Sequence, residues 1–371
     1  MREIYLDNAA TTKVSESAAE TAMRMMTLEY GNPSSLHSKG FKAERELLRA
    51  REQISTVIGA QKEEIIFCSG GTEANNLAIL GAAKKHSRRG KTIITTPYEH
   101  SSVYETAKHL ESQGFTVRFI PPGEIAAAAD EDTILVSCMA VNSETGAVTD
   151  VAAIAAAVKR KNPQALFHTD AVQAFGKLPV TIRNTQIDMM SISGHKIHAP
   201  KGSGALFIRR GVKISPAVHG GGHENGLRAG TQSTPLCCAF GTAAGEAHAN
   251  LDQNLARVTA LAAHFRKRAG EIPGLCVNSP ADGSPYIQHI SLPGYISRHL
   301  MDYLSERGIY VSAGTACGRG GKSRVLDAMN MPQDKAQGAL RISFCRDNTT
   351  EEADAFFAAL TAAVNQITKR G

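Results

Sequence analysis

The sequence predicts an α/β fold in which a large domain with a mainly parallel sheet is joined to a smaller α/β domain. Three observations predict it. The length of 371 residues is enough for two domains. Along the first two thirds of the chain, short apolar runs alternate with helical stretches, which is typical of a parallel sheet covered by helices. After about residue 250 this alternation gives way to longer helices and a segment rich in proline and glycine.

Six apolar runs are expected to form strands buried on both faces, namely 64–69, 91–96, 133–141, 165–169, 188–193 and 204–208. The clearest helix between them is 151–160, because Asp150 is a favourable N-cap and basic residues stand at its end. Ligands of such folds bind outside the carboxyl ends of the strands. We therefore expect the functional residues in the loops that follow the strands.

The smaller domain is expected to contain a helix over 247–271, a helix over 297–307, a strand over 308–312 and a final helix from residue 350. The first residues of the chain are expected to pack with it. The predicted boundaries are therefore 15–256 for the large domain, and 1–14 with 257–371 for the small one.

Composition excludes several classes of protein. Apolar residues make up 42% and charged residues 20%, as in a globular protein and unlike a disordered chain. The net charge of +6 is scattered and tryptophan is absent, so neither a basic nucleic-acid-binding face nor a base-stacking platform is expected. The N-terminus has no signal-peptide pattern, and the longest uncharged run is too polar for a membrane helix.

The seven cysteines are irregularly spaced and form no CxxC pair. Their number and spacing argue against a disulfide scaffold and a zinc ribbon. Two close histidine pairs, His195 with His198 and His219 with His223, also lack the spacing of a helical zinc motif. We therefore expect a cytoplasmic protein without a catalytic metal, in which any special cysteine is a reactive one.

Polar residues follow five successive strands. The first strand leads into Ser69-Gly-Gly-Thr72, which can form an anion cup at a helix N-terminus. The groups after the next four strands are His100, Asn142, Asp170 with Gln173, and Ser193 with His195 and Lys196. Each position alone has an ordinary structural explanation, such as a helix cap or a core residue. Together they supply what pyridoxal phosphate (PLP) requires: a lysine for covalent attachment, an aspartate for the pyridine nitrogen, a phosphate cup, a donor near the phenolic oxygen and a flat side chain over the ring.

The chain resembles the NifS/IscS-type cysteine desulfurases of the class-V aminotransferase family, which are fold-type-I PLP enzymes. The resemblance runs nearly end to end and is carried by 5–12, 31–35, 69–73, 99–100, 168–173, 193–196, 219–224, 228–231 and 312–317. It implies that Lys196 binds PLP covalently, that Asp170 pairs with the pyridine nitrogen, and that His100 stacks on the ring and assists proton transfers. The remaining roles are phosphate binding by Gly71, Thr72, Ser193 and His195, contact with the phenolic oxygen by Gln173 and Asn142, phosphate binding in a neighbouring subunit by Thr231, and substrate binding by Arg341, Asn32 and Asn142. The role of Thr231 implies a homodimer.

Cys317 is the candidate nucleophile, in a glycine-rich loop with Arg319, Lys322 and Arg324 close in sequence. Cys68 and Cys138 lie inside strand patterns and are expected to be buried. The resemblance implies that L-cysteine is converted to L-alanine while its sulfur passes to Cys317 as a persulfide, and then to an acceptor protein that the sequence does not identify.

Two alternatives remain open. Within the PLP enzymes, a selenocysteine lyase acting on L-selenocysteine depends less on its cysteine, whereas an aminotransferase needs no Cys317 at all. In a different class, 316–323 nearly fits a nucleotide-binding P-loop, with alanine at its first glycine position. A P-loop would leave the PLP-like residues unexplained.

Two departures from the family bear on the sulfur acceptor. The loop after Cys317 is shorter, more basic and richer in glycine than the Ser-rich loop of relatives. The chain also stops soon after the last expected helix, where relatives that supply an iron–sulfur scaffold often continue. We therefore expect an acceptor that does not dock as that scaffold does.

Overall fold

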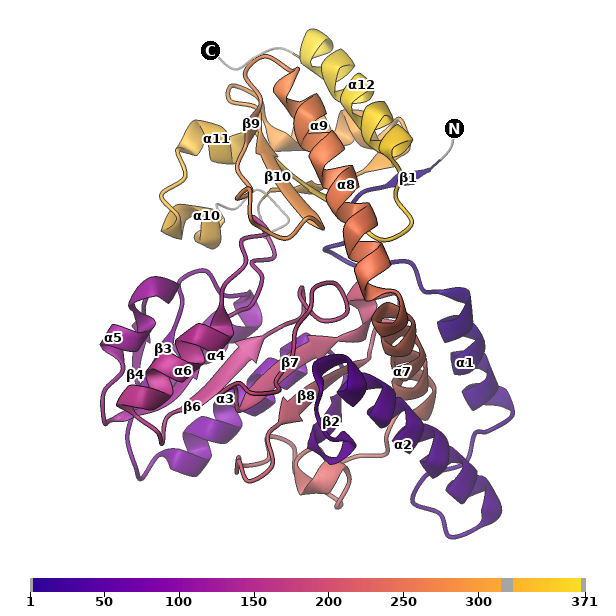
Figure 1. The fold of residues 1–371 in the computed structure, drawn as a ribbon, viewed down its shortest axis with the longest axis vertical. Helices are drawn as coiled ribbons and strands as arrows, with labels where there is room; N and C mark the ends of the chain where they lie inside the picture. The colour runs from indigo at the N-terminus through magenta and orange to yellow at the C-terminus, as the bar shows by residue number, and fades with distance from the viewer. Residues whose placement is uncertain (1–2, 315–322, 368–371) are drawn as a thin grey trace. The chain divides into compact units, whose positions relative to one another are not determined.

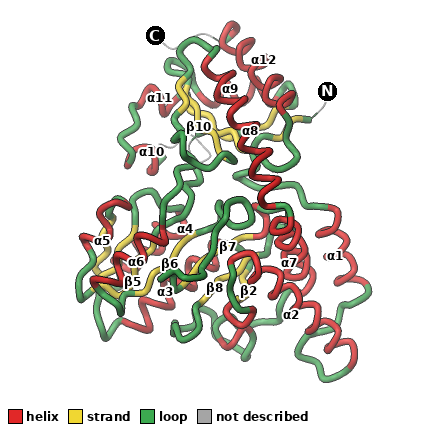
Figure 2. Tube along the Cα trace, viewed as in Figure 1, coloured by secondary structure: helices red, strands yellow, loops and turns green. Residues whose placement is uncertain are grey.

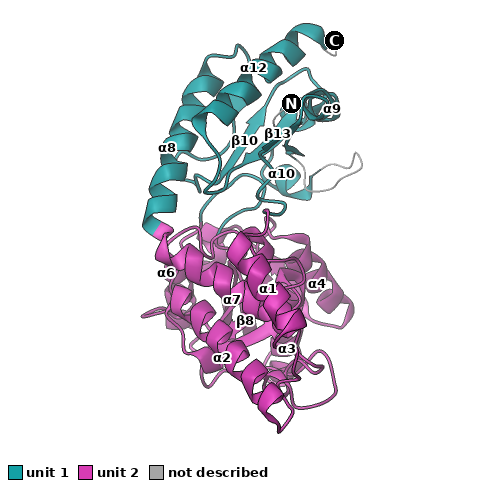
Figure 3. Ribbon diagram, turned by 90° about the vertical axis from the view of Figure 1, so that its right-hand side faces the viewer, with its two compact units in different colours: residues 1–12, 141–148, 252–371 teal, residues 13–140, 149–251 magenta. Residues whose placement is uncertain are grey.

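The computed structural model describes residues 3–314 and 323–367. The chain divides into two compact units, coloured separately in Figure 3. Unit 1 comprises Met1–Thr12, Val141–Val148 and Asp252–Gly371, and unit 2 comprises Lys13–Ala140 and Thr149–Leu251. The predicted boundaries differ from these by a few residues at 12 and at 251. They also leave Val141–Val148 in the large domain, whereas this segment, with Asn142, belongs to unit 1.

Unit 2 is built on a seven-stranded sheet with the order β2-β8-β7-β6-β5-β3-β4 (Figure 1). The strands are β2 (Ile65–Cys68), β3 (Thr92–Thr95), β4 (Thr116–Phe119), β5 (Thr133–Ser137), β6 (Leu166–Asp170), β7 (Met189–Ser193) and β8 (Gly204–Ile208). Only β8 runs against the others, so the predicted mainly parallel sheet is confirmed. Strand β4 is not among the predicted strands, because this edge strand is half-exposed and lacks a continuous apolar run.

Some helices of unit 2 cover this sheet, and others pack mainly on one another (Figure 2). They are α1 (Glu16–Thr27), α2 (Ser38–Ile58), α3 (Gly71–His86), α4 (Ser101–Ser112), α5 (Ile125–Ala128), α6 (Val151–Lys161) and α7 (Thr234–Ala249). Helix α3 packs on β5 to β8, while α1 and α2 pack on α7. The predicted cap of α6 is confirmed, because the Asp150 side chain accepts a hydrogen bond from the Ala153 N–H.

Unit 1 contains a four-stranded antiparallel sheet with the order β12-β13-β10-β9 and a parallel pair, β1 with β11. These strands are β1 (Ile4–Tyr5), β9 (Cys276–Val277), β10 (Ile287–Ser291), β11 (Ile309–Tyr310), β12 (Ser312–Ala313) and β13 (Ala339–Ser343). The helices are α8 (Leu251–Gly270), α9 (Ser297–Ser305), α10 (Arg324–Ala328), α11 (Gln333–Gln337) and α12 (Thr350–Gln366). Phe265 of α8 packs against Phe357 of α12 with ring centroids 4.6 Å apart, which joins two helices of this core.

The single helix predicted over 247–271 is wrong. Helix α7 ends at Ala249 and α8 begins at Leu251. Asn250 separates them, because its side-chain Nδ2 donates to the Glu246 carbonyl oxygen and so caps α7. Within residues 3–314 and 323–367, no helix is both long enough and apolar enough to cross a membrane.

Candidate active site

The N-terminus of α3 begins directly after the end of β2 and is the turn expected to bind an anion. Its N-cap is Gly70, so no side chain caps the first turn. Gly71 is required here, because a Cβ at this position would lie 2.7 Å from Val172 Cγ2. The Ser193 hydroxyl, at the end of β7, is buried beside this turn and has no hydrogen-bond partner among the described residues. Backbone N–H groups at a helix start together with an unpaired hydroxyl suit a phosphate.

Asp170 ends β6 and is 5% exposed. Its Oδ1 accepts a hydrogen bond from the Val172 N–H at 3.0 Å, and its Oδ2 accepts one from Asn75 Nδ2 at 2.8 Å. Both oxygens are thus held, which fixes the plane of the carboxylate. A fixed carboxylate can pair with a protonated ring nitrogen, the role expected of Asp170.

His100 is the N-cap of α4. The residue is exposed, and its Nδ1 is held by Ser102. Nδ1 accepts from the Ser102 N–H at 3.1 Å and lies 2.8 Å from Ser102 Oγ. Ser102 Oγ also lies 2.8 Å from Asn75 Nδ2, the amide that contacts Asp170. A chain of hydrogen bonds therefore joins two of the predicted site residues.

Gln173 lies in the turn after Asp170 and is buried. Its Oε1 accepts a hydrogen bond from Lys177 Nζ at 3.0 Å. This bond orients the side-chain amide, so that Nε2 is the atom able to donate to an oxygen of a ligand.

Lys196 follows β7 in a short 3-10 turn, η3 (Gly194–Lys196), and is half-buried. Gly194 allows this turn to pack closely, because a Cβ there would lie 2.9 Å from the Phe240 ring. Burial, with Lys196 next to it, lowers the pKa of His195 to about 4. His195 is therefore neutral at physiological pH in the ligand-free protein.

Arg341 of unit 1 lies on β13 and is 9% exposed. Its Nη2 donates to Asp7 Oδ1 at 3.0 Å and to Ser312 Oγ at 3.2 Å. Its Nη1 donates to the Ser143 carbonyl oxygen, whereas its buried Nε has no hydrogen-bond partner among the described residues. The guanidinium is thus held in one orientation with donor capacity left for a carboxylate.

Asn142 belongs to unit 1, in a tight turn between Val141 and Val148. Its Oδ1 accepts from the N–H groups of Glu144 and Thr145, at 3.0 and 2.9 Å. Any hydrogen bond from this side chain to a ligand oxygen is therefore donated by Nδ2.

The remaining predicted site residues lie apart from these contacts. Asn32 is exposed in the loop between α1 and α2, and its side chain accepts from the Ser34 N–H. Thr231 is also exposed. Cys317, with Arg319 and Lys322, lies outside the described residues, as does the P-loop-like stretch apart from Ser323, whose hydroxyl donates to the buried Glu144 carboxylate at 2.6 Å.

Four other cysteines are unsuited to act as thiolates. Cys68, Cys138, Cys237 and Cys238 are buried, which confirms the prediction for the first two. Burial raises the pKa of all four thiols, and that of Cys238 to about 12. Cys276 and Cys345 are only partly buried.

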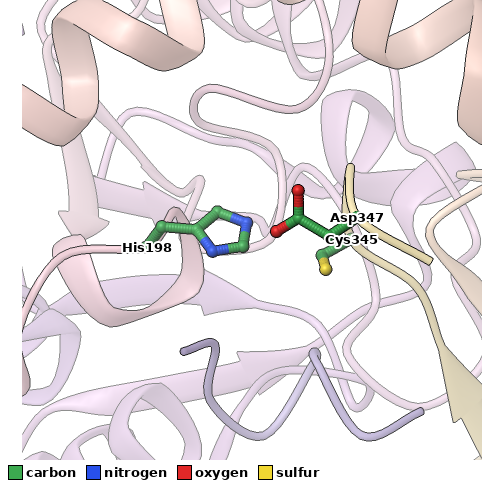
Figure 4. A group of neighbouring side chains, drawn as sticks. All are labelled: His198, Cys345 and Asp347. Atoms are coloured by element: carbon green, nitrogen blue, oxygen red, sulfur yellow. The ribbon is translucent and has the colours of Figure 1, made fainter. Parts of the chain in front are cut away.

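Figure 4 shows three side chains whose types can bind a metal. His198 belongs to unit 2, where its Nδ1 lies 2.8 Å from the Lys13 carbonyl oxygen. Cys345 and Asp347 belong to unit 1 and follow β13. Because the group is divided between the two units, it supports no metal site, and the expected lack of a catalytic metal stays a prediction.

A buried ion pair holds the loop before Thr231. Glu224 is 5% exposed, and its two carboxylate oxygens each accept a hydrogen bond from Arg51 at 2.7 Å. Glu224 Oε2 also accepts from the Phe67 N–H at 2.8 Å. We expect Glu224→Gln to lower the free energy of unfolding by about 3 kcal/mol, because it leaves the Arg51 charge buried without its partner. Urea unfolding measures this, and a loss no larger than that of Asp302→Asn, which breaks an exposed pair, would contradict it.

Stability should fall in acid through the buried histidines. Burial lowers the pKa of His168 to about 3 and that of His289 to about 4, whereas both titrate near 6.5 when unfolded. Their stabilising contribution is present above pH 6.5 and is lost as the unfolded chain takes up protons below it. Between pH 7.5 and pH 5.5, each of the two histidines should lower the free energy of unfolding by about 1.4 kcal/mol.

Urea unfolding of His168→Gln at the two pH values tests this. Glutamine can still bond Ser137 and Ser191, the partners of the His168 ring, but it does not titrate. The variant should therefore show the smaller fall, and an equal fall in both proteins would refute the assignment to His168.

The sequence analysis missed several residues that hold the site. Asn75, Ser102 and Lys177 support Asp170, His100 and Gln173, while Asp7 and Ser312 hold Arg341. Asn75 had one available signal, because it is a polar residue on the apolar face of a helix, beside Ala74, Leu77 and Ala78. The others have no local pattern that distinguishes them.

The chain is similar to known proteins along nearly its whole length. The sequence model of the class-V aminotransferase family matches residues 4–356. Cysteine desulfurase IscS of Methanosarcina thermophila is 37% identical over 95% of this chain and 90% of its own length. A solved structure of a NifS-like protein has a TM-score of 0.94 at 37% identity and covers 99% of this chain and 100% of its own. A second solved structure, titled SspA in complex with cysteine, has a TM-score of 0.81 at 32% identity and covers 94% of this chain and 100% of its own.

The family model covers most of the chain, and the relatives named above are more than 30% identical over nearly its whole length. The protein belongs to the class-V aminotransferase family and, within it, to the NifS- and IscS-like cysteine desulfurases.

Proposed function

We propose that this protein is a PLP-dependent cysteine desulfurase, which converts L-cysteine to L-alanine and transfers the sulfur to Cys317. The observation that carries the proposal is the arrangement at the carboxyl edge of the unit 2 sheet. There the α3 turn, the Asp170 carboxylate, the His100 ring and the turn that bears Lys196 follow β2, β6, β3 and β7. Its relatives are named cysteine desulfurases, and one related structure is titled as a complex with cysteine.

The residues of unit 2 fit PLP. The buried, unpaired Ser193 hydroxyl and the uncapped start of α3 suit its phosphate. The fixed carboxylate of Asp170 suits its ring nitrogen, and Gln173 Nε2 suits its phenolic oxygen. When bound, PLP supplies an electron sink for the electron pair released at the substrate α-carbon.

Each side chain of the proposed active site has a separate role. Lys196 attaches the cofactor and is the base positioned by β7, while Asp170 keeps a proton on the ring nitrogen. The exposed His100 ring would stack on the cofactor and exchange protons through Nε2, since Nδ1 is engaged by Ser102. Arg341 binds the substrate carboxylate, with Asp7 and Ser312 holding its orientation. Asn142 and Asn32 assist in substrate binding.

Sulfur passes from the thiol of the substrate to the thiol of Cys317. The Cys317 thiolate attacks the substrate sulfur, so that an S–S bond forms as the carbon–sulfur bond breaks. The electron pair of the broken bond stays on the β-carbon, which takes up a proton and becomes the methyl group of alanine. The balance is one enzyme thiol and one cysteine giving one enzyme persulfide and one alanine, with no external oxidant.

A second copy of the chain completes the proposed enzyme. Large apolar side chains are exposed on α1, on α2 and in the loop between them, at Met23, Met26, Leu28, Tyr30, Leu36, Phe41 and Leu48. Such a patch is typical of a protein–protein interface. Thr231 would then reach the PLP phosphate of the partner. We expect the wild type to be a dimer by light scattering and the double variant Leu36→Glu, Phe41→Glu to be a monomer; a monomeric wild type would contradict the proposal.

The persulfide is passed to an acceptor protein of unknown identity. The basic, glycine-rich loop around Cys317 supports an acceptor other than a standard iron–sulfur scaffold. Tight binding to such a scaffold in a titration would argue against this part of the proposal.

The activity is tested by incubating the PLP-loaded protein with L-cysteine. We expect alanine in the product and, by mass spectrometry, one added sulfur on the peptide that contains Cys317. Cys317→Ser should lose both, whereas Cys276→Ser, a change at a partly buried cysteine of unit 1, should keep both. Wild-type desulfuration by Cys317→Ser would disprove the persulfide role, and turnover of L-selenocysteine alone would favour the lyase.

A further inference from the structure

Asp170 and His100 are joined by a chain of hydrogen bonds through Asn75 and Ser102. Asn75 Nδ2 lies 2.8 Å from Asp170 Oδ2 and 2.8 Å from Ser102 Oγ. Ser102 Oγ in turn lies 2.8 Å from His100 Nδ1. Asn75 is 1% exposed and Ser102 8%, so water does not replace these bonds easily. The four residues come from β6, α3 and the start of α4, which are brought together only by the fold.

The bonds of this chain have a defined direction. A carboxylate only accepts hydrogen bonds, so the Asn75 amide must turn its NH₂ group toward Asp170. The second hydrogen of that group is then donated to Ser102 Oγ, which leaves the Ser102 hydroxyl hydrogen for His100 Nδ1. Since Nδ1 accepts, the neutral ring carries its hydrogen on Nε2. The Ser102 backbone N–H also donates to Nδ1 and by itself fixes this tautomer, so the Asn75 amide acts on the position of the His100 ring through the Ser102 hydroxyl.

The Asn75 side chain is costly as a packing residue. Its Oδ1 is buried and has no hydrogen-bond partner among the described residues. Its neighbours on α3, Ala74, Leu77 and Ala78, are buried and apolar. A leucine would fill similar space without an unpaired carbonyl. The amide is therefore useful for its two donated bonds, which are the ones to Asp170 and Ser102.

We propose that Asn75 is a positioning residue for the cofactor. It fixes the Asp170 carboxylate and, through the Ser102 hydroxyl, the orientation of the His100 ring. Asp170, expected at the ring nitrogen, and His100, expected to stack on the ring, are thereby positioned together. This inference rests on the proposed function, because it assumes that Asp170 and His100 contact PLP.

The test compares Asn75→Ala with Asn76→Ala. Asn76 is the next residue of α3, is only half-buried, and bonds the Thr72 carbonyl oxygen and Thr106 instead. PLP is titrated into each apoprotein, and the visible circular dichroism of the bound cofactor reports how firmly its ring is held. We expect Asn75→Ala to bind PLP about tenfold more weakly, with a smaller dichroic signal, because a hydrogen bond to a charged group is lost. Asn76→Ala should match the wild type.

Two further measurements separate positioning from folding. Thermal unfolding of the apoproteins shows whether Asn75→Ala folds. If it does not fold, the isosteric variant Asn75→Asp is used to test the positioning role. Asn75→Asp keeps the volume but cannot donate to Asp170 when ionised, so it should also weaken PLP binding. In a His100→Ala background the effect of Asn75→Ala should shrink, because the two residues act together.

The outcomes are distinct. Wild-type PLP affinity and dichroism in both Asn75→Ala and Asn75→Asp would overturn the positioning role and leave the proposed function standing. A wild-type protein that takes up no PLP would overturn the proposed function, and this inference with it.

Discussion

Replacing Lys196 by alanine is expected to abolish cysteine desulfuration, with a loss of about 10³-fold or more. Lys196 stands three residues after the buried Ser193 hydroxyl, in a turn that Gly194 allows to pack against α7. It follows β7, which pairs with β6, at the sheet edge where Asp170 lies.

The covalent link is measured directly. Borohydride reduction of the PLP-loaded wild type should fix the cofactor on the peptide that contains Lys196, and the Lys196→Ala protein should carry none. The matched control is Lys201→Ala, which removes an exposed lysine five residues further along the same loop. Labelling of another lysine in the wild type, or full activity in Lys196→Ala, would refute the assignment.

Replacing Arg341 by alanine is expected to raise the KM for L-cysteine by about 100-fold, since a buried charge-assisted contact of this kind is worth about 2–5 kcal/mol. Asp7, Ser312 and the Ser143 carbonyl oxygen already hold the guanidinium. Its remaining donors are the Nε–H and one hydrogen of Nη1, which lie in the fixed plane of the guanidinium. Arg341→Lys should not restore the KM, because an ammonium group does not present donors in the fixed plane of a guanidinium.

Cysteamine, which is cysteine without its carboxylate, makes the test specific. The wild type should turn over cysteine far better than cysteamine, and Arg341→Ala should remove most of that difference while PLP affinity stays near the wild-type value. Arg298→Ala, which removes an exposed arginine of unit 1, serves as the control. If Arg341→Ala keeps the preference for cysteine, Arg341 does not bind the carboxylate.

The sequence by itself determined much of this protein, for reasons that act locally. Buried parallel strands require continuous apolar runs, and six of the seven strands in unit 2 were found in this way. Asp170 and Lys196 follow such runs directly, so their place at the carboxyl edge of the sheet could be predicted. The half-exposed β4 and the break at Asn250 were missed, because an edge strand and a side-chain cap within a helical stretch leave weak patterns.

Only the tertiary structure decided which residues support the site. Asn75 is 95 residues from Asp170 and 27 from Ser102 in sequence, and Asp7 is 334 from Arg341. No spacing rule connects such pairs, because their contact depends on how α3 lies on β6 and how the first residues join unit 1. Periodicity reports which face of an element is buried, whereas the direction of a hydrogen bond depends on the partner that packing brings opposite. The sequence therefore predicts the groups that face the cofactor, and the fold decides what holds them still.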